Sequence, residues 1–441
     1  MELSAPMIGV IVFLIMLVLV FIGTPVFVSL LCAAFIGFLW LKGGSMALLL
    51  SKFTLTPFDL AANYTYAVLP MFMLVGSLAG ETGIAGSAFE AMHTWLGRIR
   101  GGLLYTVIAA NAVFGACSGS SVAGNIVFGR LALPELDARG YKRKWSLGCI
   151  TASGALSCLI PPSMAIIMYC MVVPDTLSVG TALMCGIGPG LLVACMLALT
   201  VIIISIVDKG SIPAGGGPKV PMSKKLKSLL NLIPIFCLFA VIIGGTFLGL
   251  FTATVAGAIG AMVVTIYALI KRVPIKRIAW NMWDAACMEA GIFPIIISGQ
   301  LFGSFIAASR LADMLSNAIA SINAPAIAIF ALVFLLYIFL GCVMDVVSAI
   351  IITVPVVYPI LTSLGYNGYV LVIVLVFVCE IAGLTPPIGM NVFATANALR
   401  INSSEIFAGV VPYFICDVLC VFIIILFPQI ALTIPGLMGV I

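Results

Sequence analysis

Charged residues are scarce in this chain, and only one histidine is present. Of the 441 residues, 8% are charged and 63% are hydrophobic. An ordinary soluble domain carries about 25% charged residues, so this composition excludes a soluble protein and indicates a polytopic membrane protein. A membrane helix needs roughly 20 apolar residues, so the chain has room for about 11 crossings and not for a second, soluble domain.

Motifs for metal, redox or nucleotide chemistry are also missing. The 13 cysteines lie almost wholly in apolar runs without metal or redox spacing, and we interpret them as packing residues. No phosphate-binding loop or ATPase motif is present, so an ion gradient or a partner must supply energy. A membrane serine hydrolase is one alternative, because Ser120 lies in a Gly-Ser-Ser stretch. Its hydroxyl would need contact with a histidine, but His93 falls in an amphipathic segment, so we expect no enzyme.

One pattern occurs twice in the chain, a polar stretch followed by a Pro-Pro pair inside an apolar run. The positions of Ser120 and Asp345 differ by 345 − 120 = 225, and those of Pro161 and Pro386 differ by 386 − 161 = 225. The same offset relates three more pairs, Pro134 with Pro359, Gly140 with Gly365, and Tyr141 with Tyr366. Such a constant offset indicates an internal duplication.

The Pro-Pro pairs predict helices that are broken inside the membrane, because proline removes a backbone donor and blocks helix continuation. We expect broken helices at about 145–173 and 369–398, each preceded by a re-entrant hairpin, at about 103–136 and 326–362. The hairpin arms have about 14 apolar residues, fewer than the roughly 20 that span a bilayer. Interrupted segments in corresponding halves mark the binding site of a secondary transporter. The alternative is that the prolines only kink ordinary membrane helices.

The basic residues predict how the repeats are oriented. Loops 137–144, 208–227 and 271–277 carry 4, 5 and 4 Lys or Arg residues, whereas loop 363–368 carries none. The positive-inside rule therefore places the first three loops in the cytoplasm and the fourth outside. The same duplicated element then opens to opposite sides of the membrane, which is an inverted-topology repeat.

The predicted fold is an all-α polytopic membrane protein with about 11 transmembrane helices and two re-entrant hairpins. No basic segment precedes the first apolar run, so we expect a membrane helix at about 7–22 and not a cleaved signal. The expected parts are scaffold helices with an interfacial segment (1–65), a first repeat (66–207), a cytoplasmic linker (208–228), further scaffold helices (229–280) and a second repeat (281–441).

Polar groups beside the two breaks are candidates for ion and substrate binding. The hydroxyls at 118–121 would face unwound carbonyls near 159–162, and hydroxyl and carbonyl oxygens suit sodium. Helix N-termini beside them suit an anion. In the second repeat, Asp345, Ser348 and the backbone of Gly341 would face Thr385. The alternative is that these are small helix-packing residues, which are common in membrane bundles.

Carboxylates inside membranes are costly and are therefore functional candidates. Asp345 is the best of them, because it lies at a hairpin tip. Glu380 could bind a cation or a proton, or it could brace a helix. Three others are expected to be interfacial or paired, namely Asp284, Glu289 and Asp417. Arg130 is expected to extend to the cytoplasmic interface.

Several motifs together resemble the large membrane subunit of tripartite ATP-independent periplasmic (TRAP) transporters, over nearly the whole chain. They are residues 69–72 (Leu-Pro-Met-Phe) with Gly76, 81–84 (Glu-Thr-Gly-Ile), 118–123 (Ser-Gly-Ser-Ser-Val-Ala), Pro134 with Gly140 and Tyr141, 160–163 (Ile-Pro-Pro-Ser), Gly341 with Asp345, Pro355 with Pro359, and 385–389 (Thr-Pro-Pro-Ile-Gly) with Asn391. The resemblance implies sodium-coupled uptake of a small organic anion, such as a carboxylate, sialate or sulfonate, by an elevator mechanism in the bacterial inner membrane.

The resemblance also implies two partners, a periplasmic substrate-binding protein and a small four-helix membrane subunit, which we expect to be a separate chain. It implies a first sodium site at Ser118, Gly119, Ser120, Ser121, Ile160 and Pro161, and a second at Gly341, Asp345, Thr385 and Pro386. It implies substrate contacts from Ser120, Asn125, Ser163, Thr385 and Asn391. The alternative function is a stand-alone sodium- or proton-coupled symporter for dicarboxylates or citrate.

Overall fold

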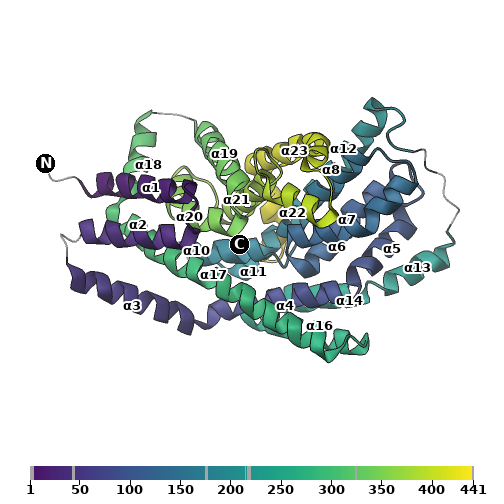
Figure 1. Cartoon of the computed structure of the whole chain (residues 1–441), viewed down its shortest axis with the longest axis horizontal. Coiled ribbons are helices and arrows are strands. Elements are labelled where there is room, and N and C mark those ends of the chain that lie inside the picture. The colour runs from purple at the N-terminus through teal and green to yellow at the C-terminus, as the bar shows by residue number, and fades with distance from the viewer. Residues whose placement is uncertain are drawn as a thin grey trace.

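The chain folds into helices that lie along an elongated molecule (Figure 1). The computed structural model describes residues 4–41, 45–173, 177–213, 215, 220–322 and 325–439, and these residues include no strand. Three N-terminal helices lie at one end, α1 (Ala5–Phe21), α2 (Val26–Leu41) and α3 (Met46–Ala62). Pro25 directly precedes α2, as expected of a residue that begins a helix well but cannot continue one.

A second group of helices connects this end to the rest of the molecule. After a short turn (Tyr64–Ala67) come α4 (Val68–Glu81) and the amphipathic α5 (Ile84–Leu96). The longest helix, α17 (Ile275–Ser309), packs on both α2 and α4, and α16 (Ala253–Ile270) also packs on α4. The expected boundary between residues 280 and 281 lies inside α17.

The first repeat contains a helical hairpin and a broken helix. The hairpin is α6 (Gly102–Ser118) and α7 (Ser121–Ala138). The broken helix consists of α8 (Arg143–Ser153), the single turn α9 (Leu156–Leu159) and, after the Pro-Pro break, α10 (Met164–Val172). The second repeat has the hairpin α19 (Ala326–Val343) and α20 (Val346–Ser363), and its broken helix is α21 (Gly368–Ala382) and α22 (Met390–Leu399).

The offset found in the sequence also relates the helix boundaries, which confirms the duplication. The first positions of α7 and α20 differ by 346 − 121 = 225, and their last positions differ by 363 − 138 = 225. Their preceding arms end at 118 and 343, and the broken helices begin at 143 and 368, which is the same offset again. Both Pro-Pro bonds, 161–162 and 386–387, are cis.

Some expected details were wrong. The arms of the first hairpin are helices of 17 and 18 residues, not about 14, because the helices continue into the flanking polar residues. Both arms of the second hairpin are long and apolar enough to cross a membrane. By length and composition the described residues hold six such spans, or up to nine if each bent pair is one span. The total of about 11 therefore stays a prediction.

The remaining helices surround the repeats or join them. They are α11 (Val179–Cys185), α12 (Ile187–Val207), α13 (Met222–Leu230), α14 (Ile233–Phe239), a π-helical segment (Ala240–Gly244), α15 (Gly245–Phe247), α18 (Leu311–Ile322), α23 (Ser403–Leu426) and α24 (Gln429–Leu437). The expected linker 208–228 is thus partly helical, and α24 was not expected. The sequence also predicts a loop position for Asp175, and this residue lies outside the described residues.

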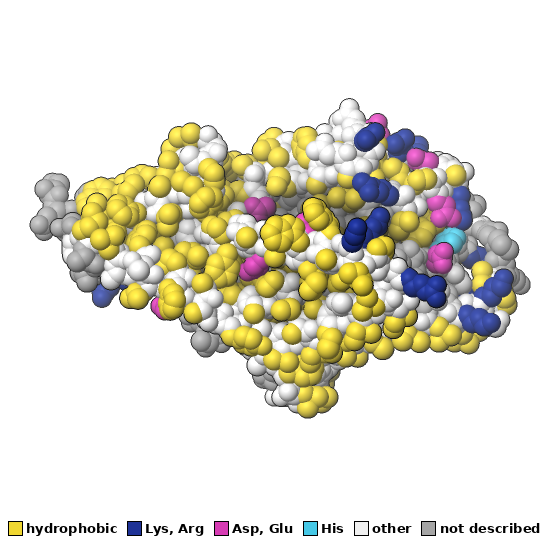
Figure 2. All heavy atoms as spheres, turned by 60° about the horizontal axis from the view of Figure 1, so that its bottom comes forward, with side chains coloured by type: hydrophobic (Ala, Val, Ile, Leu, Met, Phe, Trp, Pro, Cys, Tyr) yellow, Lys and Arg dark blue, Asp and Glu magenta, His cyan; other side chains and the backbone are white. Residues whose placement is uncertain are grey.

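The outer surface has the pattern of a membrane protein. One face is mostly hydrophobic, and Lys and Arg side chains gather at one end of it (Figure 2). Large apolar side chains are exposed on most of the helices that could span a membrane, for example Leu199 and Ile203 on α12. Water would disfavour such surfaces, whereas lipid does not.

The helix α23 is held closely on α8 by two glycines. A Cβ built on Gly148 would overlap the backbone of Gly409, and one built on Gly409 would overlap the carbonyl group of Lys144. Small residues allow such close backbone approach between membrane helices. The last long helix is therefore attached to the first half of the first broken helix.

Candidate functional site

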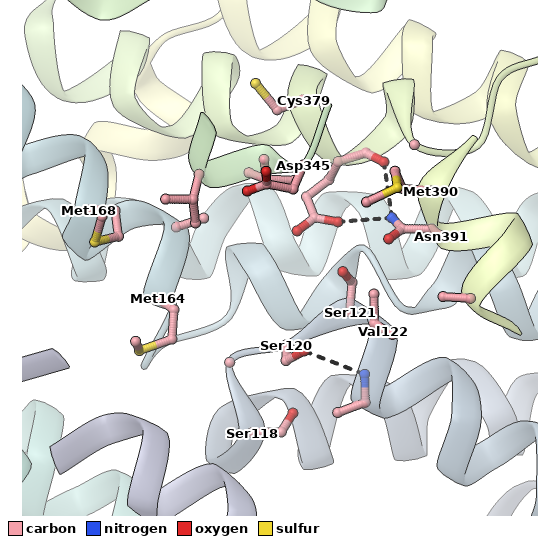
Figure 3. Close-up of a pocket in the computed structure, with 18 of the residues that line it drawn as sticks. Ser118, Ser120, Ser121, Val122, Met164, Met168, Asp345, Cys379, Met390 and Asn391 are labelled. Carbon is pink, nitrogen blue, oxygen red and sulfur yellow. Dashed lines mark hydrogen bonds between the residues drawn. The ribbon is translucent and has the colours of Figure 1, made fainter. Parts of the chain in front are cut away.

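A cavity of about 740 Å³ lies where the two repeats meet (Figure 3). The tips of both hairpins line it, as do α10 from the first broken helix and α21 and α22 from the second. Side chains of α4 and α17 complete the wall. A cavity of this volume is large enough for a small organic molecule.

The first tip places hydroxyl groups and polar backbone at the cavity. Ser118, Ser120 and Ser121 all line it (Figure 3). Ser120 caps α7 by accepting a hydrogen bond from the Ala123 backbone N–H at 3.4 Å. The Ser118 Oγ is buried and has no hydrogen-bond partner among the described residues. It is therefore available as an oxygen ligand.

The first tip also rests on the first Pro-Pro break. Gly119 has φ +58°, and a Cβ built on it would lie 2.7 Å from the Pro162 carbonyl oxygen. Only glycine satisfies both conditions without a shift of the backbone. No hydrogen bond from a described residue reaches the carbonyl oxygens of residues 160–162. Unpaired hydroxyl and carbonyl oxygens, such as these carbonyls and the Ser118 Oγ, are the neutral donor types that suit sodium.

The second tip carries a carboxylate where the first tip carries Ser120. Asp345 caps α20, and its two oxygens accept hydrogen bonds from the backbone N–H and the hydroxyl of Ser348. The Gly389 backbone N–H, beside the second break, donates to the Cys342 carbonyl oxygen at 3.2 Å. The second tip is therefore also attached to its break, and Asp345 remains exposed at the cavity.

Glu380 and Asn391 connect the two halves of the second broken helix. The Asn391 Nδ2 donates to the Glu380 carboxylate at 3.1 Å and to the Glu380 backbone carbonyl at 3.3 Å (Figure 3). Glu380 also interacts with the hydroxyl of Ser121 from the first tip. Of the roles we considered for Glu380, this geometry favours the brace between α21 and α22.

The cavity brings together only some of the residues expected at the ion and substrate sites. Its wall includes Ser118, Gly119, Ser120, Ser121, Gly341, Asp345 and Asn391. It does not include Asn125, Ile160, Pro161, Ser163, Thr385 or Pro386.

The six residues outside the wall have other positions. Ser163 caps α10 by accepting from the Ile166 N–H, and the Thr385 hydroxyl donates to the Ala382 carbonyl. Asn125 is buried behind the first tip, and its side chain overlaps the position of a Cβ on Gly154. The remaining three belong to the breaks, where Ile160 is half-buried, Pro161 is buried and Pro386 is exposed.

Much of the cavity wall was not predicted. It contains six methionines, Met73, Met164, Met168, Met288, Met344 and Met390, together with Ser77 and Asn397. Methionine suits any apolar run, so no signal in the sequence distinguishes these six from the other methionines. Among the described residues of the wall, Asp345 and Glu380 are acidic and none is Lys or Arg. An anion in this cavity would depend on helix N-termini, amide groups and bound cations.

Two carboxylates differ from our expectation that they would be interfacial or paired. Both carboxylate oxygens of Glu289, and both of Asp417, are buried without a hydrogen-bond partner among the described residues. The expectation was wrong because helix periodicity and local composition do not reveal which side chain a helix turns inward. Arg130 is exposed and outside the cavity wall, as expected of a residue that extends to the interface.

The fold and the shared cavity define a helical membrane transporter built from two repeats. Residues 13–430 match the family model described as the DctM component of the tripartite ATP-independent periplasmic transporter. The chain therefore belongs to the DctM family of TRAP transporter large permease proteins, which are multi-pass proteins of the bacterial inner membrane.

Relatives that are named for different solutes are about equally similar to this chain. The chain is 27% identical to the C4-dicarboxylate large permease protein DctM of Pseudomonas aeruginosa, over 87% of this chain and 88% of that one. It is 27% identical to the ectoine/5-hydroxyectoine protein UehC of Ruegeria pomeroyi (96% and 97% covered) and 26% identical to the sialic acid protein SiaM of Vibrio cholerae (95% and 96%).

Solved structures support the fold. The Alcanivorax borkumensis YdaH transporter is similar with a TM-score of 0.56 at 14% identity, covering 87% of this chain and 88% of that one. Neisseria gonorrhoeae MtrF, described with a class of antimetabolite efflux pumps, has a TM-score of 0.54 at 12% identity, covering 89% and 85%. At such identities the likeness concerns the fold alone.

Proposed function

We propose that this chain is the membrane-spanning carrier of a sodium-coupled TRAP transporter that takes up a small organic acid through the central cavity. The observation that carries the proposal is the convergence of both hairpin tips and both broken helices on one cavity. Duplicated elements that meet at an interrupted pair of helices are the usual site architecture of secondary transporters.

The proposed substrate carries a carboxylate or a similar acid group. The similar proteins are named for C4-dicarboxylates, ectoines and sialic acid, which are all carboxylates. In the cavity, the N-terminus of α7 begins at the first tip and that of α20 begins at the second. Each offers unpaired N–H groups and a partial positive charge to an acid group. Ser120 and Asn391 are the proposed substrate contacts, and Asn125, Ser163 and Thr385 would join them only if the tips move.

The proposed coupling ions are two sodium ions, one at each tip. The first would use Ser118 Oγ, the backbone at Gly119 to Ser121 and the free carbonyls at Ile160 and Pro161. The second would use Asp345, with the backbone at Gly341 and at Thr385 and Pro386. A sodium ion at the second tip would offset the charge of Asp345 and so reduce its electrostatic repulsion of an anionic substrate.

The proposed movement is of the elevator type. The two hairpins and the two broken helices, in the expected repeats 66–207 and 281–441, would travel together as a transport domain of inverted topology. The helices of 1–65 and 229–280, together with α17, would form the scaffold. The glycine contact between α8 and α23 supports motion as one body, because it attaches the last long helix to the first broken helix.

The proposed partners are a small membrane subunit and a periplasmic binding protein that delivers the substrate. Uptake by vesicles containing this chain and the small subunit should require both a sodium gradient and the binding protein. A stand-alone symporter, which was our alternative, would transport without either partner and would not copurify with a small membrane chain. Uptake in vesicles that hold this chain alone would therefore exclude the proposal.

The sodium sites can be tested without knowing the substrate. Thermal unfolding of the purified protein would be measured in sodium, potassium and choline salts at matched ionic strength. A ligand at 100 times its dissociation constant stabilises by about 2.7 kcal/mol per site. We expect selective stabilisation by sodium that decreases in Ser118→Ala, which removes a proposed hydroxyl ligand. Equal unfolding in all three salts, with and without the small subunit, would contradict the sodium sites.

A further inference from the structure

Asp417 is a completely buried carboxylate that the proposed ion and substrate sites do not use. It lies in the middle of α23 and is 0% exposed. Neither of its oxygens accepts a hydrogen bond from a described residue. A buried carboxylate without a partner is rare in proteins, because transfer of the charged form from water costs many kcal/mol. Its position therefore requires that something neutralise it.

On the described helices that pack against α23, no basic side chain is placed to provide that neutralisation. Among the helices packed on α23, α8 carries basic residues, Arg143 and Lys144, and they lie at its start, where Arg143 is 3.8 Å from Glu405. That end of α8 packs at Gly409, which precedes Asp417 by roughly two turns of α23, or about 12 Å along the helix. The other helices that contact α23, namely α12, α19, α21, α22 and α24, contain no Lys, Arg or His.

The titratable groups around Asp417 are mostly thiols. Cys416 and Cys420 flank it on α23, and Cys158 of α9 is in electrostatic contact with it. The other titratable groups on the neighbouring helices are Cys149 on α8, Cys195 on α12, Tyr369, Cys379 and Glu380 on α21, and Tyr337 on α19. Glu380 also acts on Cys158, so Cys158 lies in the field of both carboxylates.

These surroundings favour a proton over a hard metal cation as the group that neutralises Asp417. Sodium, magnesium and calcium need several oxygen ligands, whereas thiols are soft donors that suit other metals. The thiol hydrogen of Cys158 already points to the Ala155 carbonyl oxygen. A proton, in contrast, needs no ligand besides the carboxylate itself.

We propose that Asp417 is a proton-binding site, separate from the cavity and its sodium ions, whose proton is exchanged during transport. The proposal rests on the proposed function, because exchange requires the transport domain to move. Since α23 is attached to α8 through Gly148 and Gly409, Asp417 travels with the first broken helix. A carboxyl group carried in this way can take up a proton on one side of the membrane and release it on the other.

The bound proton can be tested without transport. Infrared difference spectra would compare the purified wild-type protein with Asp417→Asn, which keeps the size of the side chain and removes the acid. We expect the wild-type spectrum at neutral pH to contain a protonated carboxylic acid carbonyl band that is lost in Asp417→Asn. The matched control is Asp313→Asn, which changes an exposed carboxylate and should keep the band. An ionised Asp417 at neutral pH would overturn the proposal.

Exchange of the proton is tested in vesicles that contain the protein with its proposed partners and an internal pH dye. Sodium-driven uptake should move protons in the wild-type protein and in Asp313→Asn, and Asp417→Asn should lose the proton movement while retaining sodium-driven uptake. Equal proton movement in wild type and Asp417→Asn, or none in the wild type during active uptake, would overturn the proposal. An absence of any uptake, with the infrared band present, would instead count against the proposed transport function. If Asp417→Asn fails to fold, Asp417→Glu keeps the acid and should keep both signals.

Discussion

Ser120 and Asp345 occupy the same position in the two repeats, but only one of them carries a charge. Each is the N-cap of the second hairpin arm, so each has a structural role whether or not it binds an ion. Capping accounts for a side-chain oxygen at both positions. It does not account for a carboxylate at the edge of a cavity, where a hydroxyl would cap the helix at a lower desolvation cost. The charge itself is what the sodium proposal explains.

A substitution can separate these two roles at Asp345. Asparagine caps a helix about as well as aspartate, so Asp345→Asn should keep the hydrogen bond from the Ser348 N–H and lose only the charge. We expect the stabilisation by sodium to fall, by about 2.7 kcal/mol if one site is lost at 100 times its dissociation constant. Thermal unfolding in sodium and choline salts measures this difference. Asp313→Asn is the control, and an undiminished sodium effect in Asp345→Asn would contradict a charged ligand.

Gly119 provides a steric test of the first tip. Its φ is +58°, and a Cβ would lie 2.7 Å from the Pro162 carbonyl oxygen. Alanine in this conformation costs roughly 1–2 kcal/mol, and its methyl group would also push the tip away from the break. We therefore expect Gly119→Ala to fold and to lose uptake. Gly80→Ala is a suitable control, because a Cβ on Gly80 meets nothing within 4 Å, and uptake at the wild-type rate in Gly119→Ala would refute the contact.

The elements that the sequence predicts well are those that leave a periodic or a repeated trace. Both hairpins and both broken helices lie close to where the prolines and the polar tips placed them. The cavity wall was harder to predict, because Met73 and Met164 differ from other methionines only in where the fold puts them. For the same reason the sequence did not predict that Asp417 is buried or that α24 forms, since both depend on packing between distant segments.

An ion pair at the basic end of the molecule fixes the loop between the hairpin and the broken helix. The Lys142 Nζ lies 2.8 Å from both carboxylate oxygens of Asp208, and the Trp145 Nε1 donates to one of them at 2.9 Å. These hydrogen bonds, first that of Lys142 and then that of Trp145, lower the pKa of Asp208. The start of α8 is thereby attached to the end of α12.

The lowered pKa gives this attachment a definite pH dependence. Because the carboxyl is more acidic in the folded state, its contribution is fully present above the ordinary aspartate pKa of about 3.9 and is lost as the pH falls through the folded value. We expect Asp208→Asn to unfold at a lower temperature than wild type at pH 7. The two proteins should converge only in stronger acid, as the pH falls below about 3.9 and then through the lower pKa that Asp208 has in the folded protein. The unfolding temperatures of both proteins would be measured across this pH range. No difference between them at pH 7, or a difference that persists in acid, would contradict the role of Asp208.

At the scale of the whole molecule, the central question is which surfaces slide. The cavity is shared between parts proposed to move and parts proposed to stay, since its wall includes Met288 on the scaffold helix α17 as well as both tips. A movement of the hairpins would therefore change the shape of the cavity and its exposure. The contact between α17 and α20 lies on this proposed boundary.

One pair of residues on that boundary is suited to a disulfide. A Cβ built on Gly299 of α17 lies 3.5 Å from the Cβ of Ile351 on α20, within the range that a disulfide bridges. In a background whose exposed cysteines are replaced, Gly299→Cys with Ile351→Cys should lose uptake on oxidation and recover on reduction, because the bond joins the scaffold to the transport domain. Gly190→Cys with Leu159→Cys is the matched control, since its 3.6 Å Cβ–Cβ separation lies wholly within the first repeat. If the cross-linked double-cysteine protein transports as fast as the same protein after reduction of the disulfide, α17 moves together with the hairpins. The division into scaffold and transport domain would then have to be redrawn.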